Sequence, residues 1–309
     1  MQYIGEFISI GVALSWTITA ILSEYAGKRM GSIVLNMYRM LFALAFSFVF
    51  FWIVLGSPLP MPAGGNAYLW MMLSGVIGYV ICDYCLMKCY IIIGSSYGQL
   101  FMTLAPVSAA ITAWITLGQR LELKSILAMA VTLAGIGISI LGRGANKRLA
   151  INLPLNGVIY ALIAAVCQGI GLVVSKIGMN VYAEDMPADM MEAQPWILPF
   201  CANFFRCVAG LIGFSLLMMV SRHVDDFKQR RHDRRGMLAV ALTTIFGPFA
   251  GVAFSLLAVQ YTAAGIASTL MAMTPIFILP ASHYIFHQPV TVRSVVGAVI
   301  SVLGVSLFF

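Results

Sequence analysis

The sequence predicts an all-α integral membrane protein with ten transmembrane helices, arranged as two inverted repeats of five helices each. Three observations support this prediction: the composition, the lengths of the apolar segments, and a repeat of the sequence within itself. Of the 309 residues, 61% are hydrophobic and only 9% are charged, whereas soluble domains carry about 25% charged residues. A chain of this composition is expected in a lipid bilayer.

The second observation is the length of the apolar segments. A hydrocarbon core about 30 Å thick requires about 20 apolar residues in each spanning helix. The first segment has no Lys or Arg ahead of it and no clear small-residue cleavage site, so we expect a retained span and not a signal peptide. In chain order, the ten predicted spans are Tyr3–Ser23, Val34–Leu55, Ala67–Met87, Tyr97–Leu117, the short Ser125–Leu141, Leu155–Ser175, Ile197–Val220, Met237–Gln260, Gly265–Phe286 and Thr291–Phe309.

The third observation is an internal repeat. When Pro106 is placed over Pro275, an offset of 169 residues, the halves match without gaps from Gly78/Gly247 to Gly135/Gly304. Near the start of each half, SWTITAILS at 15–23 aligns with CQGIGLVVS at 167–175, an offset of 152. The difference places about 15 extra residues in the second half, in the acidic loop YAEDMPADMMEAQPW.

The repeat divides the chain into units at 1–148 and 149–309, each with five predicted spans. Because five is an odd number, the second unit enters the membrane in the opposite direction to the first. Many transporters consist of such inverted repeats, related by a pseudo-two-fold axis in the membrane plane.

Charge and motif content exclude several functional classes. The net charge of +7 comes largely from residues between apolar segments, which suits loops beside anionic lipid head groups better than a nucleic-acid surface. Cys82, Cys85 and Cys89 share a helix face, but cysteine also packs well as a small apolar residue. His283 and His287 lack the Glu of an H-E-x-x-H zinc helix. We therefore predict no metal, no cofactor and no enzymatic activity; an intramembrane enzyme acting on lipids remains an alternative.

Two predicted spans carry an arginine three residues after an asparagine, as Asn36–Arg39 and Asn203–Arg206. A charge in the middle of a membrane helix costs at least ~2.5 kcal/mol, so it usually faces a partner or a cavity inside the bundle. A guanidinium group presents a planar fork of donors to carboxylate or phosphate. Both pairs are therefore candidates to bind an anionic substrate group, and the alternative is that each arginine tethers neighbouring helices.

Asp83 is the only acidic residue well inside a predicted span, and its counterpart in the second half is Val252. Because the third span ends on the side of the membrane where the second begins, Asp83 is expected at the depth of Arg39. An ion pair between them is one hypothesis. A protonatable group that couples transport to protons is another, and the two are compatible.

Several further side chains could donate or accept hydrogen bonds to a solute near the membrane midplane. Ordinary packing between helices is the alternative for each of them. These candidates are Trp16, Tyr79, Gln99, Thr103, Gln168, Ser268 and Thr269.

The sequence resembles the EamA-type transporters of the drug/metabolite transporter superfamily. The resemblance is carried by the two five-helix halves, the N-x-x-R near the start of the second and seventh spans, and the prolines of the fourth and ninth. The small-residue segments GSSYGQ and AAGIAS and the closing AGIG and LGVS add to it. The turns after the fourth and ninth spans depart from the family pattern, because Gln119 and Gln288 replace a glutamate.

These observations together predict a secondary transporter that moves a small organic metabolite by alternating access. The resemblance implies export of amino acids or related metabolites. Efflux of larger apolar compounds and a structural or sensory role are the alternatives. The expected location is the bacterial plasma membrane, as a multi-pass monomer or homodimer.

Orientation gives the first testable prediction. The loops after odd-numbered spans hold most of the basic residues, and the loops after even-numbered spans hold only Arg120, Lys124 and Lys176. The positive-inside rule therefore places both termini outside the cytosol, whereas the resemblance implies that both are cytosolic. We expect a reporter fused to residue 309 to be inactive if it functions only in the cytosol; an active reporter would overturn the charge-based assignment.

Overall fold

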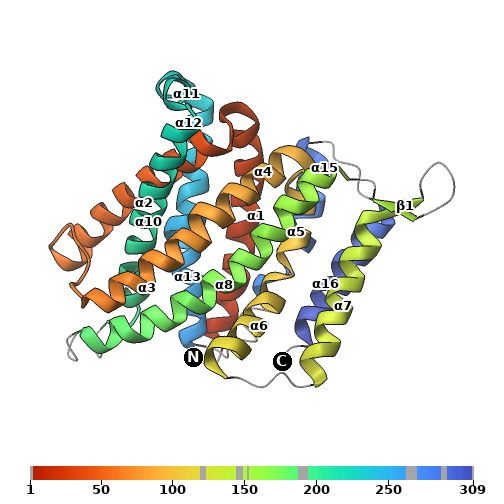
Figure 1. The fold of residues 1–309 in the computed structure, drawn as a ribbon, viewed down its shortest axis with the longest axis horizontal. Helices are drawn as coiled ribbons and strands as arrows, with labels where there is room; N and C mark the ends of the chain where they lie inside the picture. Colours follow the sequence, from red (N-terminus) through yellow and green to blue (C-terminus); the bar gives the residue numbers. More distant parts are fainter. Residues whose placement is uncertain are drawn as a thin grey trace.

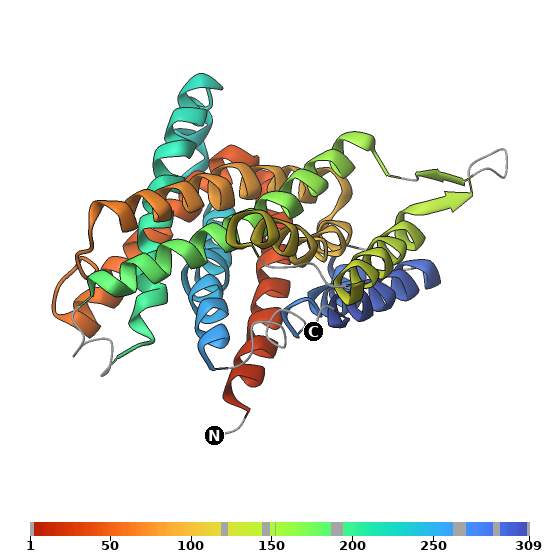
Figure 2. The ribbon, with the colours of Figure 1, turned by 60° about the horizontal axis from the view of Figure 1, so that its bottom comes forward.

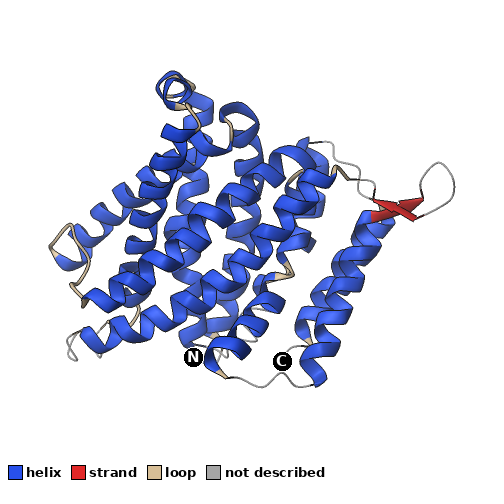
Figure 3. Ribbon diagram, viewed as in Figure 1, coloured by secondary structure: helices blue, strands red, loops and turns tan. Residues whose placement is uncertain are grey.

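The computed structural model describes residues 3–118, 123–143, 149–151, 153–186, 194–261, 270–286 and 291–307. Helices dominate this part of the chain, with one two-stranded antiparallel hairpin projecting from the bundle (Figures 1 and 3). The hairpin consists of β1 (Leu141–Arg143) and β2 (Leu149–Ile151) and lies at the predicted junction between the two halves.

The helices follow the order expected from the apolar segments. Those of the first half are α1 (Ile4–Met30), α2 (Ser32–Leu55), α3 (Gly65–Gly75), the π-helical segment η1 (Val76–Asp83), α4 (Tyr84–Ile93), α5 (Ser95–Met102), α6 (Ala105–Leu117) and α7 (Leu123–Ile140). Those of the second half are α8 (Leu155–Asp185), α10 (Ile197–Val220), the short α11 (Val224–Arg230), α12 (Arg234–Thr244), η2 (Ile245–Phe249), α13 (Ala250–Tyr261), α15 (Thr274–Phe286) and α16 (Val292–Ser306).

Within the described residues, seven helical stretches are long and apolar enough to cross a membrane. They are Ile4–Met30, Ser32–Leu55, Gly65–Ile93, Ser95–Thr116, Leu155–Asp185, Ile197–Val220 and Arg234–Ala258. Ile126–Ile138 and Val292–Ser306 are apolar but shorter. The first part of the ninth predicted span, Gly265–Phe286, lies largely outside the described residues, so the count of ten remains a prediction.

Two glycines form the sharp corners of the first half. Gly31 lies between α1 and α2 with φ of +80°, and Gly94 lies between α4 and α5 with φ of +87°. Glycine adopts this backbone region without the steric penalty of a Cβ atom. At both positions one helix ends and the next begins within a single residue.

Hydrogen bonds between hydroxyl groups join the first helix of each half to the third span of the other. Ser23 on α1 contacts Thr243 on α12 with an oxygen–oxygen distance of 2.7 Å. Ser74 on α3 contacts Ser175 on α8 at 2.6 Å. The repeat alignment equates Ser23 with Ser175, and the offset of 169, extended four residues before Gly78, places Ser74 over Thr243. These are therefore equivalent contacts made in exchanged order.

The last helix of each half pairs with its counterpart. In Figures 1 and 2, α7 and α16 lie side by side at one edge of the bundle. The absence of a Cβ at Gly135 and at Gly304 allows close approach, because an added Cβ would meet the backbone of Ser301 and of Thr132, respectively. Small residues permit such close packing between membrane helices. Here too, equivalent residues meet one another.

Candidate functional site

The third span of each half changes from α-helical to π-helical geometry at equivalent positions. The segment η1 begins at Val76 and η2 begins at Ile245, which the repeat alignment equates. A π-helical turn interrupts the regular hydrogen-bond pattern and is frequent at functional sites. In η2 the interruption includes Pro248, which has no backbone N–H.

Arg39 belongs to a closed group of buried polar side chains. Its Nη1 donates to Asp83 Oδ2 at 2.9 Å and to Asn36 Oδ1 at 2.7 Å. Asn36 Nδ2 in turn donates to the backbone oxygen of Asp83 at 3.2 Å. All three residues are buried. The ion pair expected between Arg39 and Asp83 is therefore present.

Arg206 has equivalent placement but different surroundings. It is only 7% exposed, and its guanidinium carbon lies 5.1 Å from the centre of the Tyr79 ring. Among the described residues, no carboxylate or carbonyl oxygen accepts a hydrogen bond from Arg206, and its Nε atom is buried without a partner. Arg206 is thus a buried cation held on an aromatic ring, and it forms no ion pair with an acidic residue in the part of the chain that the structure describes.

Two differences between the halves explain this contrast. Asp83 corresponds to Val252, so the second half has no carboxylate at that position. Tyr79 corresponds to Pro248, and the Tyr79 hydroxyl donates to Asn203 Oδ1 at 2.6 Å. Asn203 Nδ2 donates to the Pro248 oxygen at 2.5 Å. The Asn203 amide oxygen therefore already accepts a hydrogen bond from Tyr79, whereas the equivalent oxygen of Asn36 accepts one from Arg39.

Each arginine reaches across to the π-helical segment of the opposite half. A Cβ added to Gly78 would lie 2.8 Å from Arg206 Nη2, and one added to Gly247 would lie 3.5 Å from Arg39 Nη2. Gly78 and Gly247 are equivalent in the repeat. Glycine at both places leaves space for a guanidinium at the interface between the halves.

The remaining predicted site residues lie in several environments. Gln168 accepts a hydrogen bond from Cys82 Sγ at 3.4 Å, and its counterpart Trp16 places Nε1 beside Gly251. Gln99 donates to the Tyr90 hydroxyl at 2.5 Å, and Thr103 donates to the Leu100 oxygen at 2.7 Å.

Tyr79 thus joins Asn203 and Arg206, whereas Gln99 and Thr103 bond to neighbours in their own half of the chain. Ser268 and Thr269 lie outside the described residues.

One buried acidic residue was missed by the sequence analysis. Glu24 is fully buried and accepts a hydrogen bond from the backbone N–H of Ser95 at 2.6 Å, at the start of α5. Lys28 Nζ lies 2.5 Å from Glu24 Oε1. The helix α1 continues to Met30, beyond the predicted end at Ser23. The Lys four residues after the Glu was the available signal, because such pairs commonly form along one helix face.

Metal binding and nucleophilic catalysis each require a specific arrangement of side chains. The described residues contain no group of three or more His, Cys, Asp or Glu side chains that could hold a metal ion. The segment GSSYG at 94–98 fits the spacing G-x-S-x-G. It joins two helices, however, whereas the nucleophile elbow of hydrolases joins a strand to a helix.

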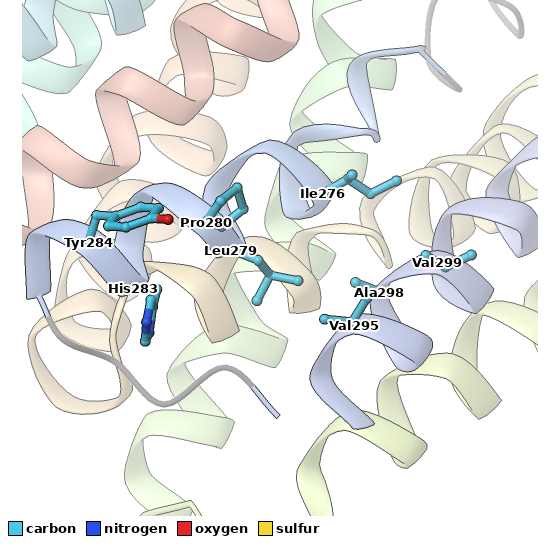
Figure 4. A pocket seen from close by; sticks show the side chains of 8 residues that line it. All are labelled: Ile276, Leu279, Pro280, His283, Tyr284, Val295, Ala298 and Val299. Carbon is cyan, nitrogen blue, oxygen red and sulfur yellow. The ribbon is translucent and has the colours of Figure 1, made fainter. Parts of the chain in front are cut away.

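A cavity of about 310 Å³ lies between α15 and α16 (Figure 4). Most of its lining is apolar, with His283 and Tyr284 at one end. The residues that line it are Ile276, Leu279, Pro280, His283, Tyr284, Val295, Ala298 and Val299. None of the predicted site residues contributes to this lining.

An ion pair between Arg29 and Asp233 joins two helix ends. Arg29 Nε and Nη2 donate to the two carboxylate oxygens of Asp233 at 2.8 and 2.9 Å, which links the end of α1 to the start of α12. The hydrogen bond from Arg29, followed by the backbone N–H of Gly236, holds the pKa of the Asp233 carboxyl below its usual value of 3.8.

We expect this ion pair to make a small, pH-dependent contribution to stability, because exposed pairs are weak. A lowered carboxyl pKa stabilises the folded state above the usual value of 3.8, and the contribution is lost as the pH falls through the lowered value. Asp233→Asn should therefore lower the melting temperature slightly at pH 6, and the difference from wild type should shrink below pH 3.8. An unchanged difference in acid would contradict this assignment.

Comparison with known proteins gives three results. The profile of the EamA-like transporter family matches residues 3–141 and 155–309. The "Uncharacterized inner membrane transporter YhbE" of Escherichia coli K12, and its counterpart in Shigella flexneri, are each 25% identical over 154 residues. These alignments cover 50% of this chain and 42% of the relatives. One solved crystal structure has a TM-score of 0.62 at 16% identity and covers the whole chain and 97% of its own.

Proposed function

The chain belongs to the EamA-like transporter family, and from this membership we propose that it is a secondary transporter that exports small organic metabolites such as amino acids. Membrane transport of small molecules follows from the family. The substrate class, the direction and the mechanism are our proposal. The chain is a multi-pass protein whose relatives include an inner membrane transporter, and we place it in the bacterial inner membrane.

The proposed architecture has ten spans, five in residues 1–148 and five in residues 149–309. The exchanged contacts Ser23–Thr243 and Ser74–Ser175 support it, because a two-fold relation between halves requires such pairs. The pairing of α7 with α16 supports it in the same way. An inverted relation between the halves gives each side of the membrane an equivalent set of helices.

The observation that carries the proposal is the pair of buried arginines at the interface between the halves. Arg39 and Arg206 occupy equivalent positions, and each lies against the π-helical segment of the opposite half. Movement of one half relative to the other would therefore change the surroundings of both guanidinium groups. In transporters built from inverted repeats, alternating access is largely a rigid-body movement of one repeat against the other around a site at their interface.

The substrate-binding residues that we propose surround this interface. Arg206, Tyr79 and Asn203 form the part of the site that lacks an acidic partner, whereas Asn36, Arg39 and Asp83 form the closed part. Asp83 is also the candidate for proton coupling. Trp16, Gln99, Thr103, Gln168 and Ser268 remain proposed contacts. We also propose anionic lipids around the basic loops and a monomeric or homodimeric state.

Metabolite profiling of the medium and cytosol provides the first test. Cells that express the protein should release more of one or a few amino acids or related metabolites than cells without it. Release of apolar compounds alone would favour the alternative of drug-like efflux. Identical profiles under all growth conditions would contradict a role in export.

A further inference from the structure

We infer that Arg206 is a binding site for a single carboxylate group of the substrate, which the divergence of the two halves has left without an internal anion. This inference rests on the proposed function and deepens it, because it names the chemical group that the site recognises. Arg39 and Arg206 are equivalent in the repeat, but only Arg39 forms an ion pair with a carboxylate among the described residues.

The first half shows what a filled site of this type contains. Asp83 gives one oxygen to Arg39 at 2.9 Å, and Asn36 gives its amide oxygen to the same Nη1 at 2.7 Å. An internal carboxylate therefore occupies the position in which an external one would bind. Arg39 is therefore already paired with an anion, which distinguishes it from Arg206, although the Nε atoms of both arginines have no partner among the described residues.

The second half has the same arginine without the carboxylate. Val252 replaces Asp83, and Tyr79 takes the amide oxygen of Asn203. Arg206 nevertheless remains only 7% exposed, with a buried Nε that has no partner among the described residues. A buried cation without a counter-charge is costly, so an anion that reaches Arg206 recovers a large part of that cost.

The surroundings of Arg206 also orient it. The Tyr79 ring lies against the guanidinium group, with the ring centre 5.1 Å from its carbon, and the Tyr79 hydroxyl is held by Asn203 at 2.6 Å. Tyr79 and Asn203 are thus positioning residues, because Asn203 holds the Tyr79 hydroxyl and the Tyr79 ring lies against the guanidinium. The N–H groups of that guanidinium stay available for a ligand. A planar guanidinium fork matches the two oxygens of a carboxylate.

The net charge of the buried side chains Arg39, Arg206 and Asp83 indicates which ligand charge the site favours. Arg39 and Arg206 contribute two positive charges and Asp83 contributes one negative charge, which leaves one positive charge unmatched. A monocarboxylate anion would neutralise it, whereas the carboxylate of a zwitterionic amino acid would pair with Arg206 and its ammonium group would keep the net charge at one positive charge. A doubly charged phosphate monoester would leave a negative charge buried in its place. The structure therefore favours a singly charged carboxylate over a phosphate.

The repeat supplies a direct test. Val252 is half-buried and lies on α13, which packs against α10, so Val252→Asp places a carboxylate at the position equivalent to Asp83. We expect this carboxylate to pair with Arg206 and act as an internal substitute for the ligand. The matched control is Val252→Asn, which has nearly the same size and polarity but no charge.

The first measurement needs no substrate. We expect the purified Val252→Asp protein to melt a few degrees above Val252→Asn at pH 7. This order should be lost or reversed when both substitutions are made in an Arg206→Gln background, because the new carboxylate then has no cation. Equal melting temperatures for the two single variants, or the same difference in both backgrounds, would overturn the inference.

The second measurement uses sodium propionate and L-alanine as probes, with ethylammonium chloride and sodium phosphate as comparisons. Propionate and alanine should raise the melting temperature of the wild-type and Val252→Asn proteins more than either comparison compound. Val252→Asp and Arg206→Gln should show no such increase. Stabilisation that persists in Arg206→Gln, or is strongest with phosphate or ethylammonium, would contradict a carboxylate site at Arg206. Amino-acid export with wild-type rates in Arg206→Gln would leave the proposed function intact and overturn only this inference.

Discussion

Replacing Arg206 with alanine is expected to lower the transport rate at least roughly tenfold while a folded protein still reaches the membrane. Hydrogen bonds to a charged group contribute about 1.5–3 kcal/mol, and a tenfold effect corresponds to about 1.4 kcal/mol. Folding should tolerate the change, because the guanidinium makes no hydrogen bond within the described residues and rests on the Tyr79 ring. Arg206→Lys should restore little activity, since an ammonium group cannot reproduce the planar fork.

The measurement is counterflow of the exported metabolite in proteoliposomes that contain equal amounts of each variant. Arg235→Ala is the matched control, because Arg235 is exposed at the start of α12 and lies outside the proposed site. It should transport at the wild-type rate. If Arg206→Ala also does so, Arg206 tethers helices and does not bind substrate.

Asp83→Asn is expected to cause the largest loss of stability among the substitutions considered. Removing one partner of a buried ion pair costs about 3–5 kcal/mol, because the other charge stays buried and unpaired. Arg39 is 3% exposed and Asp83 is 8% exposed, so water can do little to compensate. The second substitution Arg39→Gln should recover part of the loss, since it removes the uncompensated charge.

A double-mutant cycle measures this coupling from the melting temperatures of the wild type, Asp83→Asn, Arg39→Gln and the double variant. We expect the double variant to be more stable than the sum of the two single effects implies. Additive losses would show that the two side chains do not interact energetically. Arg235→Gln combined with Asp83→Asn is the control, because Arg235 is exposed at the start of α12 and takes no part in this ion pair.

The sequence supported the pairing of Arg39 with Asp83 as one of two compatible hypotheses, because the directions of consecutive spans place the two residues at a similar depth. The exchange of equivalent contacts also follows from the internal repeat. The surroundings of Arg206 could not be predicted in this way. They depend on Tyr79, which reaches Asn203 from the opposite half, and no periodicity in the sequence encodes a contact between residues 124 positions apart.

Glu24 illustrates a second limit. The apolar pattern ends at Ser23, so a boundary there leaves Glu24 at the edge of a loop. In the structure, the helix continues because the carboxylate is satisfied by the Ser95 N–H and by Lys28. Hydropathy alone cannot reveal such a partner, since Ser95 approaches through a turn of the chain far from Glu24. The π-helical geometry of η1 and η2 is likewise a matter of local hydrogen bonding that apolar periodicity does not report.

The unmatched charge of Arg206 has a consequence for voltage. An elementary charge that crosses the whole membrane field changes in energy by about 2.3 kcal/mol per 100 mV. A site that is positive when empty and neutral when it holds a monocarboxylate therefore experiences this force mainly on the return of the empty transporter. In the export cycle that we propose, and in a cell whose interior is electrically negative, the potential would draw the empty site toward the cytosol, where the next substrate is loaded.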